Sequence, residues 1–310
     1  MTIRHLRYNE IDKTKYDRCI QTAFNGNVYS FSWYLDVVAY GWEALVEGDY
    51  ETVFPLPVKS KIGISYIFQP RFVQQLGVIS SGRLDENKVE AFLRAIPSNI
   101  RYGRFNLNRH NKVKNSKQVR VSLLPNIELN LLRPLDDIRK KYSENTRRNI
   151  LKAEKLGLTV SPWIKPEDIV SLFREAKGNE IKQWSDKDYR QLVHLMHTLL
   201  HRASGISYAA YTPSNELCAA AFFALSHQRS ILLLSAVNEK GRQSGAMHFL
   251  IDHVIHQKTD DIQILDFEGS QNPNLARFYS SFGAETFYYP MVELNRFSKV
   301  TKTILKLLNK

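Results

Sequence analysis

The fold is decided by ILLLSAVNEKGRQSGAMHFLIDHVI, residues 231–255. An apolar run ends at Val237, a polar loop with Gly241 and Arg242 follows, and Gln243-Ser244-Gly245-Ala246 opens an apolar helix. Exposed amides and small residues at a helix start let a phosphate approach the backbone, and Arg242 adds positive charge. An ordinary strand-loop-helix connection uses the same residues, so the pattern alone allows both interpretations.

Around this stretch the pattern predicts strands at 206–212, 217–226 and 230–237, separated by polar turns. A helix at 243–257, the strand DIQILDF, a helix at 274–282, a strand at 284–293 and a final helix follow. We expect the helix start after the third strand to lie at the edge of a sheet, where anionic ligands bind.

The part of the chain before residue 206 is also predicted to contain both helices and strands. Helices are predicted at 11–23, 32–40 and 85–96, and strands at 43–47, 50–59, 63–69, 103–108 and 118–131. One capped helix is predicted at 136–157, DDIRKKYSENTRRNILKAEKLG, because this segment has acids at its start and Gly157 at its end. Further helices are predicted at 166–176 and 186–203.

Length and composition limit the number of domains and the kinds of partner that the chain can have. With 310 residues, of which 43% are hydrophobic, the chain is long enough for two domains. The formal net charge of +12 favours anionic partners: nucleotide cofactors, phosphorylated substrates, nucleic acid or an anionic membrane face. The charged N-terminus and the two distant cysteines, Cys19 and Cys218, fit a cytoplasmic protein without a disulfide framework.

The loop and helix with Arg242, Gly245 and Ala246 resemble the pyrophosphate-binding arm of the GNAT acyltransferases, although Met247 stands in the last motif position. YSENTRRNILKAEKLGLTV, 142–160, and DFEGSQNPNLARFYSSFGAE, 266–285, resemble the FemABX-like branch of that superfamily. The resemblance implies an α/β (α+β) fold of two tandem GNAT-like domains, each a mixed, mostly antiparallel sheet flanked by helices. The expected domains are 1–130 and 131–295. A basic amphipathic helix, 296–310, is expected to dock on the first domain, with contact to an anionic membrane as the alternative.

The resemblance further implies an N-acyltransferase that moves an acyl or aminoacyl group onto an amine by direct attack. Acyl-CoA is the expected donor substrate, with no tightly bound cofactor, and aminoacyl-tRNA is the alternative that the peptidoglycan-branching relatives use. Arg242, Gln243, Ser244, Gly245 and Ala246 would then bind the donor. The competing hypothesis is a noncatalytic protein that binds a cell-envelope precursor or nucleic acid. The acceptor and the oligomeric state are not determined by the sequence.

The candidate catalytic groups lie at the end of the predicted strand DIQILDF. Asp266 and Glu268 are two residues apart, and alternation along a strand predicts that they share one face. Glu268, nearer the strand end, is the predicted base, whereas Asp266 is either its structural partner or the base itself. Either carboxylate could instead bind backbone amides of the following turn. Tyr279 is expected to pack against the sheet or to protonate a departing thiolate, a role that GNAT tyrosines often have.

Four further residues are candidates for substrate binding. Arg147 and Arg148, in the predicted helix, either bind a phosphate or belong to a solvated face. Trp33 and Tyr34 either line a substrate cleft or form core. The histidines at 194, 197 and 201 recur at helical spacing, but no acid or cysteine pattern completes a metal site, so no metal is expected.

Overall fold

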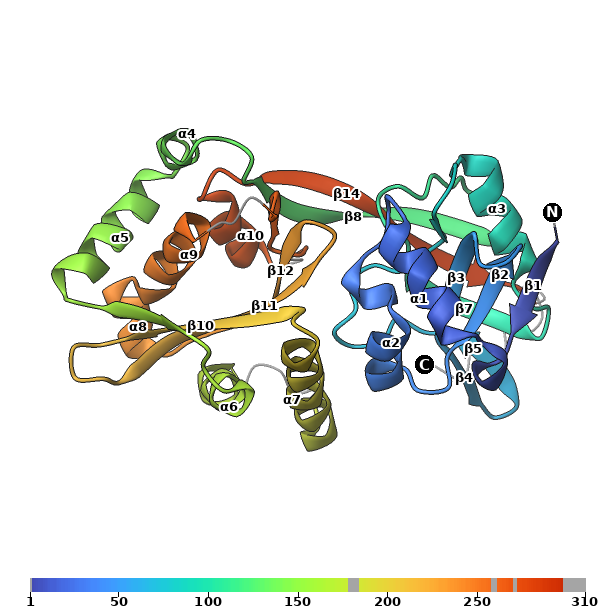
Figure 1. Cartoon of the computed structure of the whole chain (residues 1–310), viewed down its shortest axis with the longest axis horizontal. Helices are drawn as coiled ribbons and strands as arrows, with labels where there is room; N and C mark the ends of the chain where they lie inside the picture. Colours follow the sequence, from blue (N-terminus) through green and yellow to red (C-terminus); the bar gives the residue numbers. More distant parts are fainter. Residues whose placement is uncertain (1, 178–183, 258–260, 270–271, 298–310) are drawn as a thin grey trace. The chain divides into compact units, whose positions relative to one another are not determined.

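The computed structural model describes residues 2–177, 184–257, 261–269 and 272–297. The chain forms two compact units: the first runs to Leu124 and is rejoined from Tyr288 on, and the second comprises Pro125–Phe287 (Figure 1). The chain passes between them within strands β8 (Val119–Asn130) and β14 (Glu285–Asn295). The chain therefore returns to the first unit at Tyr288, whereas the predicted second domain extends to residue 295.

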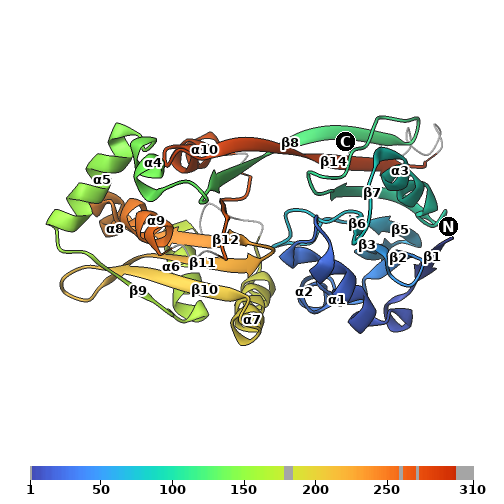
Figure 2. The same cartoon turned by 45° about the horizontal axis from the view of Figure 1, so that its top comes forward.

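The first unit contains a four-stranded antiparallel sheet, β1-β2-β3-β6, and a second group of strands in which β7 pairs with β5 and β14. Helix α3 supplies Val89, Phe92 and Leu93 to the core, while α1 and α2 lie on the other side (Figure 2). The elements are β1 (Ile3–Leu6), α1 (Lys13–Thr22), α2 (Ser32–Val38), β2 (Glu43–Glu47), β3 (Thr52–Leu56), β4 (Val58–Lys61), β5 (Ile64–Ile67), β6 (Ile79–Ser80), α3 (Glu86–Ala95) and β7 (Ile100–Asn106), with short 3-10 helices at Tyr8–Glu10 and Val28–Ser30.

The second unit has strands in the order β8-β13-β12-β11-β10-β9, antiparallel except for the neighbours β12 and β13. Helices α5, α8, α9 and α10 cover one face, and α6 and α7 cover the other (Figures 1 and 2). The remaining elements are α4 (Leu135–Lys140), α5 (Glu144–Lys155), β9 (Thr159–Pro162), α6 (Pro166–Lys177), α7 (Asp186–His201), β10 (Gly205–Tyr211), β11 (Leu217–Ser226), β12 (Arg229–Val237), α8 (Glu239–Ser244), α9 (Ala246–His256), β13 (Ile264–Asp266) and α10 (Pro273–Ser280).

This α/β architecture, with mixed and mostly antiparallel sheets, confirms the predicted fold class, but three local predictions are wrong. The helix expected at 136–157 is divided into α4 and α5, because Ser143 caps a second helix by accepting a hydrogen bond from the Thr146 amide. The polar loop expected around Gly241 is the short helix α8, which Asn238 caps. The strand expected to carry Glu268 ends at Asp266.

Within the described residues, no helix combines the length and the apolar character that a membrane span requires. The predicted C-terminal helix lies almost wholly outside the described residues. Of its segment only Arg296 and Phe297 are described, and the Arg296 guanidinium donates hydrogen bonds to the Ile96 and Pro97 carbonyls at the end of α3.

Candidate active site

Strands β12 and β13 part from each other in the second unit. They pair in parallel only from Arg229 to Ile231, opposite Ile264 to Asp266, while β12 continues to Val237. In the described pairing, the part of β12 beyond Ile231 has β11 on one side and no strand on the other. Unpaired amide and carbonyl groups at an inner sheet edge are available to a ligand that carries amides of its own.

A cavity of about 260 Å³ opens beside this free edge. It lies between β12, the junction of α8 with α9, and α10, the helix that follows β13. Its lining combines apolar side chains with a few polar groups, the composition typical of a ligand site. The lining residues are Ser235, Val237, Gly241, Arg242, Gly245, Met247, His248, Asn274, Leu275, Phe278 and Tyr279.

The junction between α8 and α9 is held by close backbone contacts. Gly245 has a left-handed conformation, with φ of 79°, and a Cβ there would lie 2.4 Å from the Asn149 carbonyl oxygen of α5. A Cβ on Gly241 would lie 2.2 Å from the Cys218 carbonyl oxygen. Both glycines are therefore required for packing. Because Gly245 also begins α9 without a side-chain cap, the first amides of α9 are not covered by a capping side chain.

The five residues predicted to bind the donor have different positions at this junction. Arg242 and Gly245 line the cavity. The Arg242 side chain is half exposed, with Nε 3.3 Å from an oxygen of Glu239. Gln243 is exposed, the Ser244 hydroxyl donates a hydrogen bond to the Gly241 carbonyl, and Ala246 is buried. An anion at the cavity mouth would thus meet Arg242 and the start of α9, the positive end of that helix.

Tyr279 lies at the wall of the cavity formed by α10. Its ring stacks on Phe267 with centroids 4.8 Å apart, and its hydroxyl forms a hydrogen bond with Ser235 of β12. Burial raises the pKa of Tyr279 above its ordinary value, the hydrogen bond with Ser235 opposes this, and the Glu268 carboxylate raises it further. The phenol is therefore protonated at neutral pH and can act as a proton donor.

His248 is a polar residue of this cavity that the sequence reasoning missed, as it missed Ser235. It is the third residue of α9, and its ring meets Phe278 edge-on with centroids 4.8 Å apart. Burial lowers its pKa to about 4, so the imidazole is neutral at pH 7 and offers one N–H and one acceptor nitrogen. The only local signal was its place three residues after Gly245, because burial of the ring depends on α10.

Asp266 is fixed in a buried polar network. One of its carboxylate oxygens accepts hydrogen bonds from the Glu268 amide and the Asn126 side chain, and the other lies 3.0 Å from the Arg229 guanidinium. Arg229 also pairs with the Glu128 carboxylate at 3.0 Å. Burial raises the pKa of Asp266 to about 6, Arg229 counteracts this, and Glu128 adds to it. Both carboxylate oxygens of Asp266 are therefore engaged, by one backbone amide and two side chains.

Glu268 does not share a strand face with Asp266. Its φ of 58° is left-handed, so the alternation of side chains stops before it, and the predicted common face is wrong. The Glu268 carbonyl accepts a hydrogen bond from the Ile127 amide, and its carboxylate is near enough to influence Tyr279. Glu268 does not belong to the cavity lining, and its role as a base stays a prediction.

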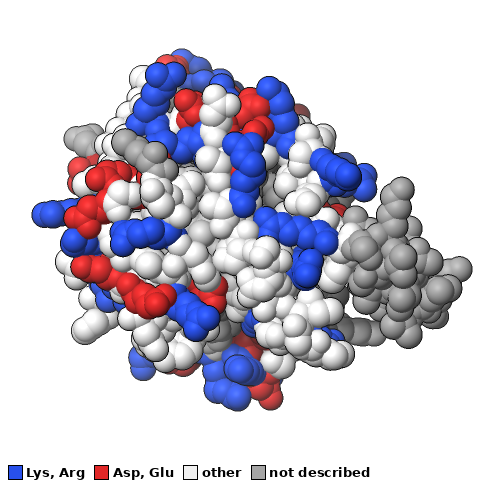
Figure 3. Space-filling view, turned by 90° about the vertical axis from the view of Figure 1, so that its right-hand side faces the viewer, with Lys and Arg blue, Asp and Glu red and all other residues white. Residues whose placement is uncertain are grey.

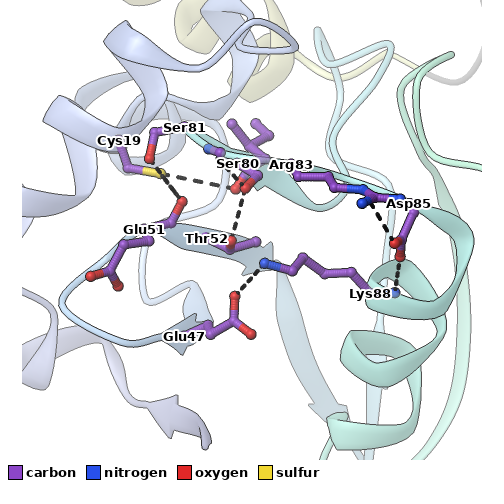
Figure 4. Close-up of polar contacts among 11 residues, drawn as sticks. Cys19, Glu47, Glu51, Thr52, Ser80, Ser81, Arg83, Asp85 and Lys88 are labelled. Atoms are coloured by element: carbon purple, nitrogen blue, oxygen red, sulfur yellow. Dashed lines mark hydrogen bonds and ion pairs between the residues drawn. The ribbon is translucent and has the colours of Figure 1, made fainter. Parts of the chain in front are cut away.

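In the first unit the start of α3, the helix between β6 and β7, already carries carboxylates. Asp85 caps α3 by accepting a hydrogen bond from the Lys88 amide, and Glu86 adds a second acid to the first turn. The Lys88 ammonium is 2.8 Å from the buried Glu47 carboxylate (Figure 4). Carboxylates therefore occupy the positive end of α3, in contrast to the start of α9.

None of the four predicted substrate-binding residues is among those that line the cavity. Tyr34 is fully buried and its hydroxyl donates to the Phe72 carbonyl, as the core alternative expected, while the ring of Trp33 stacks on Phe31. Arg147 and Arg148 are exposed on α5. The binding roles of these four residues stay predictions.

Comparison with solved structures identifies the fold. The chain is similar over its whole length, and over the whole of the other chain, to the crystal structure of FemX, with a TM-score of 0.70 and 12% identity. It is also similar to a conserved protein of unknown function from Bacteroides thetaiotaomicron VPI-5482, with a TM-score of 0.63, 8% identity and coverage of 92% and 98%. The C-terminal domain of a putative lysylphosphatidylglycerol synthetase from Agrobacterium fabrum matches with a TM-score of 0.56, 9% identity and 95% coverage of both chains.

No family model and no curated protein matches the sequence. The chain therefore has the FemX fold, as expected from the resemblance of its motifs to the FemABX-like branch.

Proposed function

We propose that the chain is an N-acyltransferase that binds an acyl thioester, acyl-CoA, in the cavity of the second unit and transfers the acyl group to an amine. The observation that carries this proposal is the parting of β12 from β13 beside that cavity. The free edge of β12 can pair with the amides of an extended pantetheine chain. The start of α9 and Arg242 can bind the phosphates.

The reaction requires little more than positioned polar groups. The neutral amine attacks the thioester carbon, the carbon–sulfur bond breaks, and the proton lost by the amine balances the one gained by the sulfur. Tyr279 can supply the proton to the sulfur because its phenol stays protonated. His248, as a neutral imidazole at a helix start, can donate its N–H to the carbonyl oxygen as negative charge develops there.

Glu268 is the proposed acceptor of the amine proton, directly or through water, and the return of this proton to the Tyr279 phenolate restores both groups. Its carboxylate lies near Tyr279, and Asp266 holds its backbone by accepting a hydrogen bond from the Glu268 amide. Asp266 is accordingly a positioning residue in this proposal, because its two oxygens already contact Arg229 and Asn126.

The test is a donor panel of acetyl-CoA, long-chain acyl-CoA and aminoacyl-tRNA, with binding measured by calorimetry and transfer to small amines measured by mass spectrometry. We expect binding of an acyl-CoA, and in Glu268→Gln unchanged affinity with transfer reduced about 100-fold or more. If only aminoacyl-tRNA supports transfer, then aminoacyl-tRNA replaces acyl-CoA as the proposed donor. Ligand binding without transfer in the wild-type protein would favour the noncatalytic alternative.

A further inference from the structure

Helix α5 presents an exposed face with four basic side chains and one apolar side chain among them. Residues four apart lie on the same side of a helix, so Arg147, Leu151 and Lys155 form one row, and Arg148 and Lys152 form the neighbouring row. All five side chains are exposed, and 54% of Leu151 is accessible to solvent. The opposite side of α5 packs into the core through Thr146, Ile150 and Ala153. We call the five exposed residues the basic face of α5.

The cations of this face are not neutralised by acids in the described contacts. Arg147 donates to the Lys140 carbonyl, and Arg148 donates to the Asn145 side-chain oxygen, both neutral groups. Two acids share this side of α5: Glu144 lies four residues before Arg148, and Glu154 lies beside the row of Arg147. In the described contacts neither forms an ion pair with a cation of the face, so its four cations exceed its two acids.

Many exposed cations elsewhere are paired. On the face of the molecule in Figure 3, Lys and Arg are scattered among neutral residues with Asp and Glu between them. Lys15 pairs with Asp49, and Lys240 pairs with Glu216. Even in α4, the helix before α5, Arg139 pairs with the buried Asp252 and Lys140 pairs with Asp137. The basic face of α5 therefore has a local positive charge. At the other described places named above, acids offset the charge of the exposed cations.

We propose that the basic face of α5 binds an anionic phospholipid surface and holds the second unit against a membrane. Unpaired Lys and Arg side chains attract acidic headgroups, while Leu151 between them can enter the boundary of the acyl chains. Leu151 is also the reason to prefer a lipid over nucleic acid, because an aliphatic side chain provides no ring on which a base can stack. This proposal is independent of the proposed acyl transfer, since none of its residues lines the cavity.

The test uses the full-length protein and sedimentation with vesicles of phosphatidylcholine, with and without phosphatidylglycerol. We expect binding only to vesicles with phosphatidylglycerol, and weaker binding as salt is raised. Each basic side chain at such a surface strengthens binding roughly five-fold, so neutralising three should weaken it about 100-fold. Glutamine preserves helix propensity and is the replacement of choice. The test variant is Arg148→Gln/Lys152→Gln/Lys155→Gln, and the matched control, on or beside α6 and α7, is Lys165→Gln/Lys187→Gln/Arg190→Gln.

A second variant separates lipid from nucleic acid. Leu151→Gln leaves the charge unchanged and should weaken vesicle binding about five-fold. The reason is that the exposed half of the leucine side chain is no longer available to move from water into the lipid. It should leave binding of bulk tRNA unchanged. The proposal is overturned by wild-type protein that does not sediment with phosphatidylglycerol vesicles at low salt, or by equal losses in the test and control variants. It is also overturned by α5-dependent tRNA binding together with vesicle binding that Leu151→Gln does not alter. Circular dichroism and the melting temperature of each variant check that the protein is folded.

Discussion

The buried network around Arg229 gives a prediction whose size follows from the contacts. The guanidinium lies 3.0 Å from both the Glu128 and the Asp266 carboxylates, and the side chains are 17%, 5% and 6% exposed respectively. Replacement of Arg229 by Leu leaves two buried carboxylates that share no cation. Removing one partner of a buried ion pair costs about 3–5 kcal/mol, so we expect a loss of this size in the free energy of unfolding at pH 7.5.

The loss should depend on pH in a defined direction. The pKa of Asp266 is already raised to about 6, and without Arg229 it rises further. A carboxyl group with a raised pKa in the folded state destabilises the protein as pH increases through that pKa, because the folded state binds more protons than the unfolded state. The cost of Arg229→Leu should therefore fall by about 2 kcal/mol between pH 7.5 and pH 5, since one pKa unit corresponds to about 1.4 kcal/mol.

Urea unfolding at the two pH values measures both quantities. Arg133→Leu is the control, because Arg133 pairs with Glu285 at 3.2 Å on the surface of the same unit, where such a pair contributes at most about 1 kcal/mol. The reasoning is refuted if Arg229→Leu costs no more than Arg133→Leu at pH 7.5, or if its cost is the same at pH 5.

Three further predictions concern the cavity. Gly245→Ala should lower the free energy of unfolding by about 2–3 kcal/mol, because φ is positive and the new Cβ meets the Asn149 carbonyl, whereas Gly82→Ala, with nothing within 4 Å, should change the melting temperature little. Tyr279→Phe should reduce kcat about 100-fold with unchanged donor affinity, and a change in affinity alone would contradict its role as an acid. His248→Gln keeps an N–H donor and should retain far more activity than His248→Phe, which should lose about 100-fold or more. Because the pKa of His248 is lowered to about 4, the histidine should cause no change of activity near pH 6.5. A transition near pH 6.5 that disappears in these variants would contradict its role.

Much of the second unit could be predicted because its signals are local. The strands and helices from Gly205 to Ser280 follow apolar periodicity and polar turns, which act over a few residues. Even the division of the predicted 136–157 helix had a local signal, since Ser143 and Glu144 repeat the pattern of a helix start seen at Asp136 and Asp137.

The polar network and the cavity depend on contacts between distant residues. Glu128 faces Asp266 only because β8 and β13 pair in that register, and no sequence pattern specifies it. The left-handed conformation of Glu268 likewise depends on the Ile127 and Asp266 contacts that hold its backbone. His248 gains its neutral state only where α10 covers it, so its chemistry could not be read from α9 alone.

Hydrogen exchange with and without an acyl-CoA tests the central claim most directly, because it locates the donor without requiring the acceptor. The account predicts new protection of β12 from Leu232 to Val237 and of the first turn of α9, with no change at the start of α3, where Asp85 occupies the helix end. Protection at α3, or an acyl-CoA that binds without protecting β12 and α9, would contradict it.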